Sequence, residues 1–438
     1  MKHSLRVWWE GRAVGTLRTN EHGEMQFVYE PTWLADAAAP PLSLSLPKRE
    51  APFKRRECRP FFAGLLPEDV QRDGVARALG VSRGNDFALL DALGGDVAGA
   101  LTLLPEGVTP PHSDSDVTTR PLEEEALRDI LDRLPSRPLL AGQDGLRLSL
   151  AGAQSKLPVV LVDDRVALPV PGQPTTHILK PPIARFSGTT ENEALVMQLA
   201  ARCGLPVAHV EPRAVERRPY LLIKRYDRRV TEGGRVRRLH QEDICQALGI
   251  VPEHKYAAEG GPTLPDTFAL VRRVTMQPAL AVLALLDVAI FNVIVGNADA
   301  HGKNFSLLLG SAVTLAPFYD LLCTSAYPEL SPRFAMKVGG ASTLEEIGGS
   351  TWSKFASDIG MGAPYVRGRV GELVGLVLGA LEEVGDSLAE RGVLDHQEVT
   401  RVATLIRSRA ERVAATADAT PAPRRGRRPL RRPLPSPE

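Results

Sequence analysis

The spacing of apolar and polar residues changes from one part of the 438-residue chain to the next. In the first hundred residues, apolar side chains recur at every second position in short runs, which predicts strands. These runs are Leu5–Trp9, Ala13–Leu17 and Met25–Tyr29. Apolar spacings of three and four residues then predict helices over Asp69–Leu79 and Asn85–Leu93. We therefore expect residues 1–104 to form a small α+β unit that serves in packing or partner contact.

The pattern changes twice after this unit. Residues 105–140 are rich in Pro, Ser, Thr, Asp and Glu, which predicts a linker with one short helix near Glu123–Leu134. Residues 141–230 show a mixed α/β pattern, and residues 231–416 are dominated by helical spacing. The predicted helices are Gln241–Leu248, Thr267–Thr275, Ala279–Val295, Tyr365–Ala389 and His396–Ala415. Strands followed by helices predict an α+β protein with two lobes behind the N-terminal unit.

Composition excludes some classes of partner. A formal charge of +1 gives no overall attraction to nucleic acid or to an anionic membrane. The four cysteines lie far apart without a CxxC pair, as in free thiols of a reducing compartment. Residues 417–438 combine many arginines and prolines, which predicts a disordered, solvated tail; a weak contact with nucleic acid or an acidic partner is the alternative.

Nothing in the sequence predicts a membrane segment. The N-terminus lacks the apolar stretch of a secretory signal. The most apolar run, Leu280–Val295, contains Asp287 and Asn292 and is too short to span a bilayer, so it predicts a buried helix. We therefore expect a cytoplasmic protein with no membrane partner.

The most informative polar segment extends from Val295 to Ser306 and separates two apolar stretches. Asp299 and Asn304 are five residues apart, the separation used in the catalytic loop of protein kinases. At that spacing a carboxylate can accept the proton of a hydroxyl while an amide oxygen binds Mg²⁺. Asp299 is therefore the predicted catalytic base and Asn304 a predicted metal ligand, with His301 a candidate for contacting the nucleotide.

A second acid, Asp320, follows an apolar run sixteen residues after Asn304. Protein kinases keep a metal-binding aspartate at a comparable place. Burying an unpaired carboxylate costs on the order of several kcal/mol, and a divalent cation shared with Asn304 would remove that cost. Asp320 is the second predicted metal ligand; an aspartate that caps a turn is the plainer alternative.

A loop of small residues precedes the apolar strand Leu157–Val162. Small residues let backbone N–H groups approach phosphate oxygens closely, although an ordinary hairpin turn has a similar composition. The nucleotide-binding candidates in this loop are Ala151, Gly152, Ala153, Gln154 and Lys156.

A lysine and a glutamate follow this loop in the order that a kinase requires. Lys180 ends the strand Thr176–Lys180 and can present its charge to phosphates, although lysines also end strands for solubility. Glu193, in the helix that continues to Cys203, is expected to hold Lys180, although with Thr190 it also forms a capping box.

The strand that leaves this lobe carries Lys224 and Tyr226. In a kinase this hinge offers backbone groups to adenine, and Tyr226 would pack on the ring. An exposed strand end is the alternative. Together these features predict an ATP-binding lobe over 141–230, a helical catalytic lobe over 231–416, and ATP and Mg²⁺ as cofactors.

These segments resemble the HipA toxin kinases. The resemblance runs from near residue 1 to about residue 410, leaving only the arginine-rich tail outside it. The motifs that carry it are Ser149–Lys156, Thr176–Lys180, Glu191–Glu193, Gly296–Phe305, Tyr319–Leu321 and, in the N-terminal unit, Pro41–Pro47, Phe61–Glu68 and Gly94–Ala100.

The resemblance implies a two-lobed protein-kinase-like fold with a small N-terminal subdomain, and a serine/threonine kinase acting as toxin of a toxin–antitoxin pair. The implied substrate is an aminoacyl-tRNA synthetase, typically the glutamyl enzyme, whose modification stops translation and favours persistence. The implied partner is a small helix-turn-helix antitoxin of HipB type, which alone contacts DNA. Autophosphorylation of a loop serine, matched by Ser149, would switch the kinase off.

Two positions depart from the family pattern. Ser155 stands where an acid is expected, so it is a rival site of autophosphorylation, and Lys224 replaces an acidic hinge residue. Two other functions fit parts of the sequence. A small-molecule kinase of aminoglycoside-phosphotransferase type shares the Asp299-to-Asn304 spacing. A DNA-binding repressor would use Gln241–Ile250 as the first helix of a helix-turn-helix, but no Arg/Lys-rich recognition helix follows.

Overall fold

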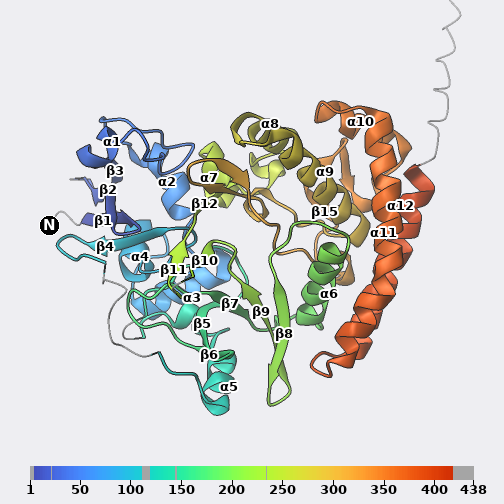
Figure 1. The fold of residues 1–438 in the computed structure, drawn as a ribbon, viewed down its shortest axis with the longest axis horizontal. Coiled ribbons are helices and arrows are strands. Elements are labelled where there is room, and N and C mark those ends of the chain that lie inside the picture. Colours follow the sequence, from blue (N-terminus) through green and yellow to red (C-terminus); the bar gives the residue numbers. More distant parts are fainter. Residues whose placement is uncertain (1–3, 21, 111–118, 144–145, 233, 418–438) are drawn as a thin grey trace, which may run out of the picture.

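The computed structural model describes residues 4–20, 22–110, 119–143, 146–232 and 234–417. Three groups of elements follow one another along the chain, as the colours of Figure 1 show. Helices and largely antiparallel sheets occur in the same molecule, which confirms the α+β class. The predicted tail lies outside the described residues apart from Ala417.

The N-terminal subdomain is a four-stranded antiparallel sheet of order β3-β2-β1-β4 covered by four helices. Its strands are β1 Ser4–Trp9, β2 Arg12–Thr19, β3 Met25–Tyr29 and β4 Leu101–Pro105. Its helices are α1 Pro31–Ala35, α2 Arg55–Ala63, α3 Asp69–Leu79 and α4 Asp86–Leu93. The alternating apolar residues of the strands pack on the inner faces of these helices and form a core of their own.

The second group is a five-stranded antiparallel sheet of order β6-β5-β7-β9-β8. Its strands are β5 Leu157–Val162, β6 Arg165–Ala167, β7 His177–Lys180, β8 Val210–Val215 and β9 Arg218–Lys224. Helix α6, Thr189–Arg202, packs against β8 and β9. Because α6 is buried along most of its length, it is held firmly between this sheet and the helical lobe.

The segment expected as a linker contributes to this second group. Helix α5, Glu124–Arg133, buries Leu127, Ile130 and Leu131 in one cluster with residues of β5 and β9. The short helix η1, Pro138–Leu140, contacts β5 and α3. The composition of residues 105–140 does not predict this packing, because the apolar residues on one face of a short helix are few beside the polar residues around it.

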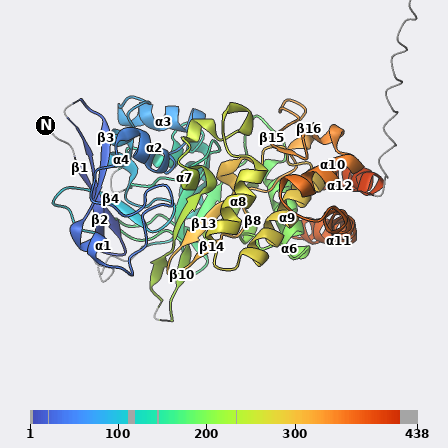
Figure 2. The same ribbon diagram turned by 90° about the horizontal axis from the view of Figure 1, so that it is seen from above.

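The largest core among the described residues lies in the helical lobe and extends to α6, β8 and β9. Its helices are α7 Ile244–Leu248, α8 Leu264–Val274, α9 Pro278–Val295, α10 Gly349–Asp358, α11 Ala363–Glu390 and α12 His396–Ala417. Short strands accompany them: β10 Arg228–Val230, β11 Val236–Arg238, β12 His240–Asp243, β13 Ser306–Leu309, β14 Val313–Leu315, β15 Arg333–Val338 and β16 Ala341–Thr343. Helices α11 and α12 lie side by side at the end of the molecule opposite the N-terminal subdomain (Figures 1 and 2).

Helix α9 is the one described helix that is long and apolar enough to cross a membrane. It packs against α8, α11 and α12, and 61% of its apolar window is buried inside the protein. This packing is that of a core helix, which agrees with the prediction of a buried helix for this run.

The predicted helix Gln241–Leu248 is wrong in its first half. His240–Asp243 form strand β12, which pairs with β13, and only Ile244–Leu248 are helical. Asp243 caps this helix by accepting a hydrogen bond from the backbone N–H of Gln246. The polar residues Gln241–Asp243 therefore precede the helix and are not part of it. The strand removes the first helix of the helix-turn-helix alternative.

Buried ion pairs join the N-terminal subdomain to the rest of the chain. The Asp96 carboxylate contacts Arg228 at 2.8 Å and Arg225 at 3.4 Å, and Arg225 also holds Asp227 at 2.7 Å. All four of these side chains are almost fully buried. Because ion pairs this deep tolerate little displacement, the subdomain sits in a fixed position against the hinge.

Candidate active site

A buried lysine joins the two lobes. The Lys180 Nζ atom, at the end of β7, lies 2.7 Å from Glu193 Oε1 on α6 and 2.7 Å from Asp320 Oδ1 in the loop after β14. Burial lowers the pKa of Lys180, but Asp320 and Glu193 outweigh that effect and raise it above its ordinary value. Lys180 is therefore a firmly charged ammonium group held by one carboxylate from each side.

Asp320 and Asn304, the two predicted metal ligands, are in direct contact. Asn304 Nδ2 donates a hydrogen bond to Asp320 Oδ2 at 3.0 Å. Asp320 adopts a φ of 59°, an uncommon backbone conformation for a residue with a Cβ, which turns its carboxylate toward Lys180 and Asn304. The neighbouring Tyr319 fixes this turn by donating a hydrogen bond to the backbone oxygen of Lys303 at 2.6 Å.

The catalytic-loop candidate begins where α9 ends. Gly296 adopts a φ of 80° and closes the helix, which directs the chain away from the helix axis. The Asn297 side chain then accepts a hydrogen bond from the Asp299 backbone N–H at 3.1 Å and donates one to Asn292 at 3.0 Å. The position of Asp299 is thus set by a hydrogen-bonded turn anchored in the core helix.

The environment of Asp299 suits a proton acceptor. Desolvation by the surrounding protein raises the pKa of Asp299 to about 6, although the nearby Lys255 and Tyr256 lower it. The residue is exposed to solvent. A base with a pKa near the working pH accepts a proton efficiently and is still ionised at pH 7. His301, by contrast, is buried, and burial lowers its pKa to about 4, so its ring is neutral.

The predicted phosphate-binding loop lies close to this cluster. Lys156 Nζ donates to the backbone oxygen of Ala151 at 2.6 Å. Gly152 adopts a φ of 115°, a backbone conformation that residues with a Cβ rarely adopt, so this position favours glycine. Desolvation and the nearby Lys180 lower the pKa of Lys156 to about 8, which marks it as a cation in need of an anionic partner. Gln154 contacts the backbone oxygen of Pro181 at 3.4 Å, and Ala153 completes the loop.

The two candidate serines of this loop differ in exposure. Ser149 is fully buried, and its hydroxyl donates to the backbone oxygen of Leu65 at 2.7 Å. Ser155 is half-buried, and its hydroxyl accepts a hydrogen bond from Gln71 Nε2 at 3.1 Å. Both serines therefore face the N-terminal subdomain.

The two hinge candidates differ in their surroundings. The ring of Tyr226 stacks on that of Tyr319 with centroids 5.7 Å apart, and its hydroxyl donates to Gln241. Lys224 is exposed at the end of β9, and its backbone N–H donates to His209. Tyr226 thus borders the Asp320 loop, whereas Lys224 is exposed to solvent.

Sequence reasoning missed three residues around Asp299. Lys255 and Tyr256 lie in the loop before α8. Both affect the pKa of Asp299, and the centroids of the Tyr256 and His301 rings are 5.4 Å apart. Glu68 comes from the N-terminal subdomain and pairs with Lys255 at 2.8 Å. The sequence offers one sign of Glu68, because it is the acid that ends the otherwise apolar run Phe61–Glu68.

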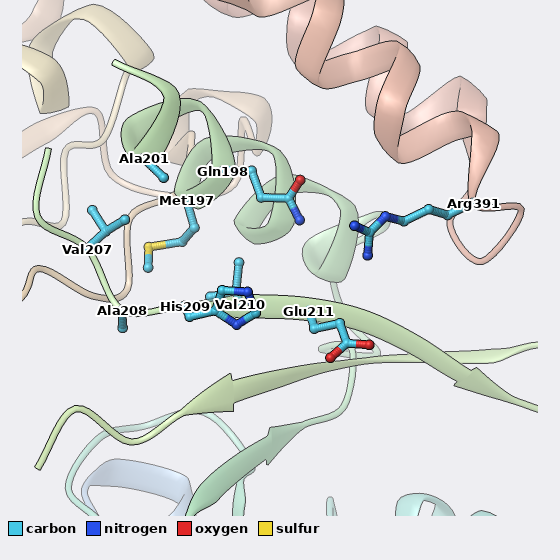
Figure 3. A pocket seen from close by; sticks show the side chains of 9 residues that line it. All are labelled: Met197, Gln198, Ala201, Val207, Ala208, His209, Val210, Glu211 and Arg391. Carbon is cyan, nitrogen blue, oxygen red and sulfur yellow. The ribbon is translucent and has the colours of Figure 1, made fainter. Parts of the chain in front are cut away.

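A separate cavity of about 470 Å³ lies between α6 and β8, lined by Met197, Val207 and Val210 among others. Figure 3 shows Gln198 of α6 and Arg391, from the end of α11, at its rim. None of the predicted site residues lines it, so it is distinct from the candidate active site.

The donor atoms fit a magnesium ion. Mg²⁺ prefers hard oxygen ligands and commonly takes one or two from the protein, completing its shell with water and substrate phosphates. Asp320 supplies a carboxylate, and burial, which raises its pKa, is outweighed by Lys180 and Lys156, so the group is ionised. Asn304 now places its amide nitrogen against Asp320, while its amide oxygen accepts a hydrogen bond from the His301 backbone N–H at 3.2 Å. Its amide would therefore have to turn over to offer the oxygen to a metal shared with Asp320.

Comparison with known proteins agrees with this arrangement. Residues 148–381 match the family of HipA-like C-terminal domains, and residues 5–104 match the HipA N-terminal domain. A Sinorhizobium fredii protein called "Putative kinase Y4mE" is 58% identical over 401 residues, covering 90% of this chain and 95% of the relative. The serine/threonine-protein kinase toxin HipA of Shewanella oneidensis is 33% identical over 291 residues, covering 64% of this chain and 66% of the relative.

A solved structure extends the comparison to the fold. The structure of the Shewanella oneidensis HipA, HipB and operator DNA complex contains a chain that superposes with a TM-score of 0.82 at 28% identity. The match covers 95% of this chain and 100% of the other. It confirms the expected two-lobed kinase-like fold with an N-terminal subdomain. The chain therefore belongs to the HipA-like kinase family.

Proposed function

We propose that this chain transfers the γ-phosphoryl group of Mg²⁺-bound ATP to a serine or threonine of a protein. The observation that carries this proposal is the contact of Lys180 with both Glu193 and Asp320, with Asn304 touching Asp320. A lysine held by a helix glutamate, beside an aspartate and an asparagine, is the arrangement that phosphoryl transfer requires.

Each group has a defined role in this proposal. Lys180 and Lys156 bind phosphate oxygens, and the backbone N–H groups of residues 151–154 lie against the same phosphates. Asn304 and Asp320 would hold Mg²⁺, which would supply positive charge to the phosphates. Asp299 accepts the proton of the acceptor hydroxyl, and its pKa of about 6 leaves it ionised at neutral pH.

The family relationship supports a biological role as the toxin of a toxin–antitoxin pair. The Shewanella oneidensis relative is named a kinase toxin, and its complex contains HipB and operator DNA. We therefore propose a small helix-turn-helix antitoxin as partner, through which the chain reaches DNA indirectly. The proposed substrate is an aminoacyl-tRNA synthetase of glutamyl type, the proposed compartment is the cytoplasm, and the proposed consequence is arrested translation and persistence.

Autophosphorylation of Ser149 is the proposed off-switch. The Ser149 hydroxyl is buried against the backbone oxygen of Leu65, so it reaches a phosphoryl donor only when the loop leaves this position. A phosphate of nearly two negative charges does not fit back into a buried site that faces a carbonyl oxygen. Phosphorylation would therefore keep the loop, with Lys156, away from ATP. Ser155 is the alternative target.

The test is phosphoryl transfer by the purified chain with γ-labelled ATP, with and without Mg²⁺. Self-labelling, and labelling of the glutamyl-tRNA synthetase of the same cell, should require Mg²⁺ and should disappear in Asp299→Asn, which preserves the size of the side chain. Labelling by that variant at the parental rate contradicts the assignment of the base. Turnover of sugars or aminoglycosides without protein labelling contradicts the proposed substrate class.

A further inference from the structure

Glu68 of the N-terminal subdomain lies between the two loops of the proposed transfer site. Its backbone N–H donates to the Gly152 oxygen of the phosphate loop at 3.1 Å, and Pro67 pairs with Gly152 in a parallel bridge. Its carboxylate points the other way, to Lys255 Nζ at 2.8 Å and Lys303 Nζ at 3.6 Å. One residue thus contacts the phosphate loop through its backbone and the catalytic side through its side chain.

Of the two lysines that Glu68 contacts, Lys303 lies in the catalytic loop and Lys255 is hydrogen-bonded to it. Lys303 directly precedes Asn304 and also binds Asp243 at 2.6 Å. The backbone oxygen of Lys255 accepts a hydrogen bond from the Gly302 backbone N–H at 3.3 Å, and the next residue, Tyr256, lies near enough to Asp299 to affect its pKa. A displacement of either ammonium group therefore shifts the residues beside the proposed base and metal ligand.

The cluster contains two carboxylates, of Glu68 and Asp243, and two ammonium groups, of Lys255 and Lys303, so its charges cancel. All four side chains are nearly buried. Burial raises the pKa of Glu68, but Lys303 and Lys255 lower it to about 2, so the carboxylate is ionised at any working pH. Without that charge, the anionic neighbours left to Lys255 among the described residues are the more distant Asp69, at 3.5 Å, and the nearby Asp299.

We propose that Glu68 is a positioning residue for phosphoryl transfer, through which the N-terminal subdomain aligns the catalytic loop with the phosphate loop. This inference rests on the proposed kinase function. Its carboxylate holds Lys255 and Lys303 so that Asp299 faces the acceptor hydroxyl, while its backbone keeps Gly152 at the phosphates. The N-terminal subdomain is then a part of the active site rather than only a surface for partners.

The test separates the side chain from the backbone. Glu68→Gln removes the charge and leaves the backbone N–H that holds Gly152. We expect kcat for self-labelling or substrate labelling to fall about 10- to 100-fold, the usual effect of removing a residue that orients a catalytic group. The KM for ATP should stay within about twofold of the parental value. The control is Glu57→Gln, which alters an exposed acid of the same subdomain that pairs with Arg49, and should leave both constants unchanged.

A second variant covers the case in which Glu68→Gln does not fold. Glu68→Gln combined with Lys255→Met removes one charge of each sign, so thermal unfolding should return toward the parental temperature while kcat stays low. A folded variant of either kind with parental kcat overturns the inference. So does a rise in the KM for ATP with kcat unchanged. If the parental chain itself transfers no phosphate, the proposed function has failed, and this outcome is recognised before any variant is compared.

Discussion

Replacing Lys180 with methionine removes the ammonium group but keeps a side chain of similar length and apolar character. The ammonium group lies 2.7 Å from both Glu193 and Asp320. Glu193 has no second hydrogen-bond partner among the described residues, and it is 4% exposed. Asp320 keeps its contact with Asn304 and is 39% exposed at the side chain, so solvent screens part of its loss. The main cost therefore comes from Glu193.

That cost has an upper limit. Without Lys180, the buried Glu193 carboxylate can bind a proton and so lose its unpaired charge. At pH 7, protonating a carboxyl whose ordinary pKa is 4.5 costs about 3.4 kcal/mol, which limits the total destabilisation. We expect Lys180→Met to lower the free energy of unfolding by about 3 kcal/mol. Because the entropy of unfolding grows with chain length, the melting temperature of this 438-residue chain should fall by about 3 °C. Phosphoryl transfer should be lost, because no ammonium group then meets the phosphates.

The pH dependence of the stability loss and a double variant both test whether Glu193 causes it. A carboxyl whose pKa is higher in the folded than in the unfolded state binds more protons when folded, so it destabilises the fold as pH rises above 4.5. The deficit of Lys180→Met should therefore shrink by about 1.4 kcal/mol per unit between pH 7 and pH 5. Lys180→Met combined with Glu193→Gln should recover most of the stability but none of the activity.

The assay is thermal unfolding followed by far-UV circular dichroism at several pH values. The matched control is Lys354→Met, because Lys354 pairs with Asp358 on an exposed helix face and should change stability by less than about 1 kcal/mol. A melting temperature for Lys180→Met equal to that of the parental protein at pH 7, or a deficit that does not depend on pH, would refute the argument.

Three further outcomes follow from the structure. Because desolvation raises the pKa of Asp299 to about 6, kcat/KM for substrate labelling should fall about tenfold per pH unit below pH 6 and level off above pH 7; an acid limb near pH 4 would contradict this. Ser149→Ala should abolish self-labelling in a phosphopeptide map, and labelling that persists on the loop would assign the site to Ser155. Asp96→Asn leaves Arg228 and Arg225 without part of their buried charge balance, and should lower the free energy of unfolding in urea by about 3–5 kcal/mol; a loss below 1 kcal/mol would show that the network is not structural.

Much of the local structure was predictable from residue spacing. The strand Met25–Tyr29 and the helix Asp69–Leu79 have the predicted bounds, and the long helices of the C-terminal lobe differ by a few residues at their ends. These segments have strong periodicity because one face meets a core. Gln241–Asp243 was misread because polar residues in a short strand and in a helix cap look alike without the partner strand.

The candidate site was partly predictable for the same reason. Asp299 and Asn304 were found from their spacing, and the structure brings Asn304, Asp320, Lys180 and Glu193 together from four separate segments. Their roles in catalysis remain predictions. Glu68 and Lys255 were out of reach, because they are 187 residues apart and only the packing of the N-terminal subdomain on the helical lobe brings them into contact.

The most direct test of the proposed kinase site asks whether Asn304 and Asp320 bind one metal ion beneath the nucleotide. Crystals grown with Mn²⁺ and a non-hydrolysable ATP analogue should show an anomalous peak about 2.1 Å from the Asp320 carboxylate and the Asn304 amide oxygen, with the β- and γ-phosphates beside Lys180. A metal bound elsewhere, with Asp320 and Asn304 unliganded at saturating nucleotide, would contradict it.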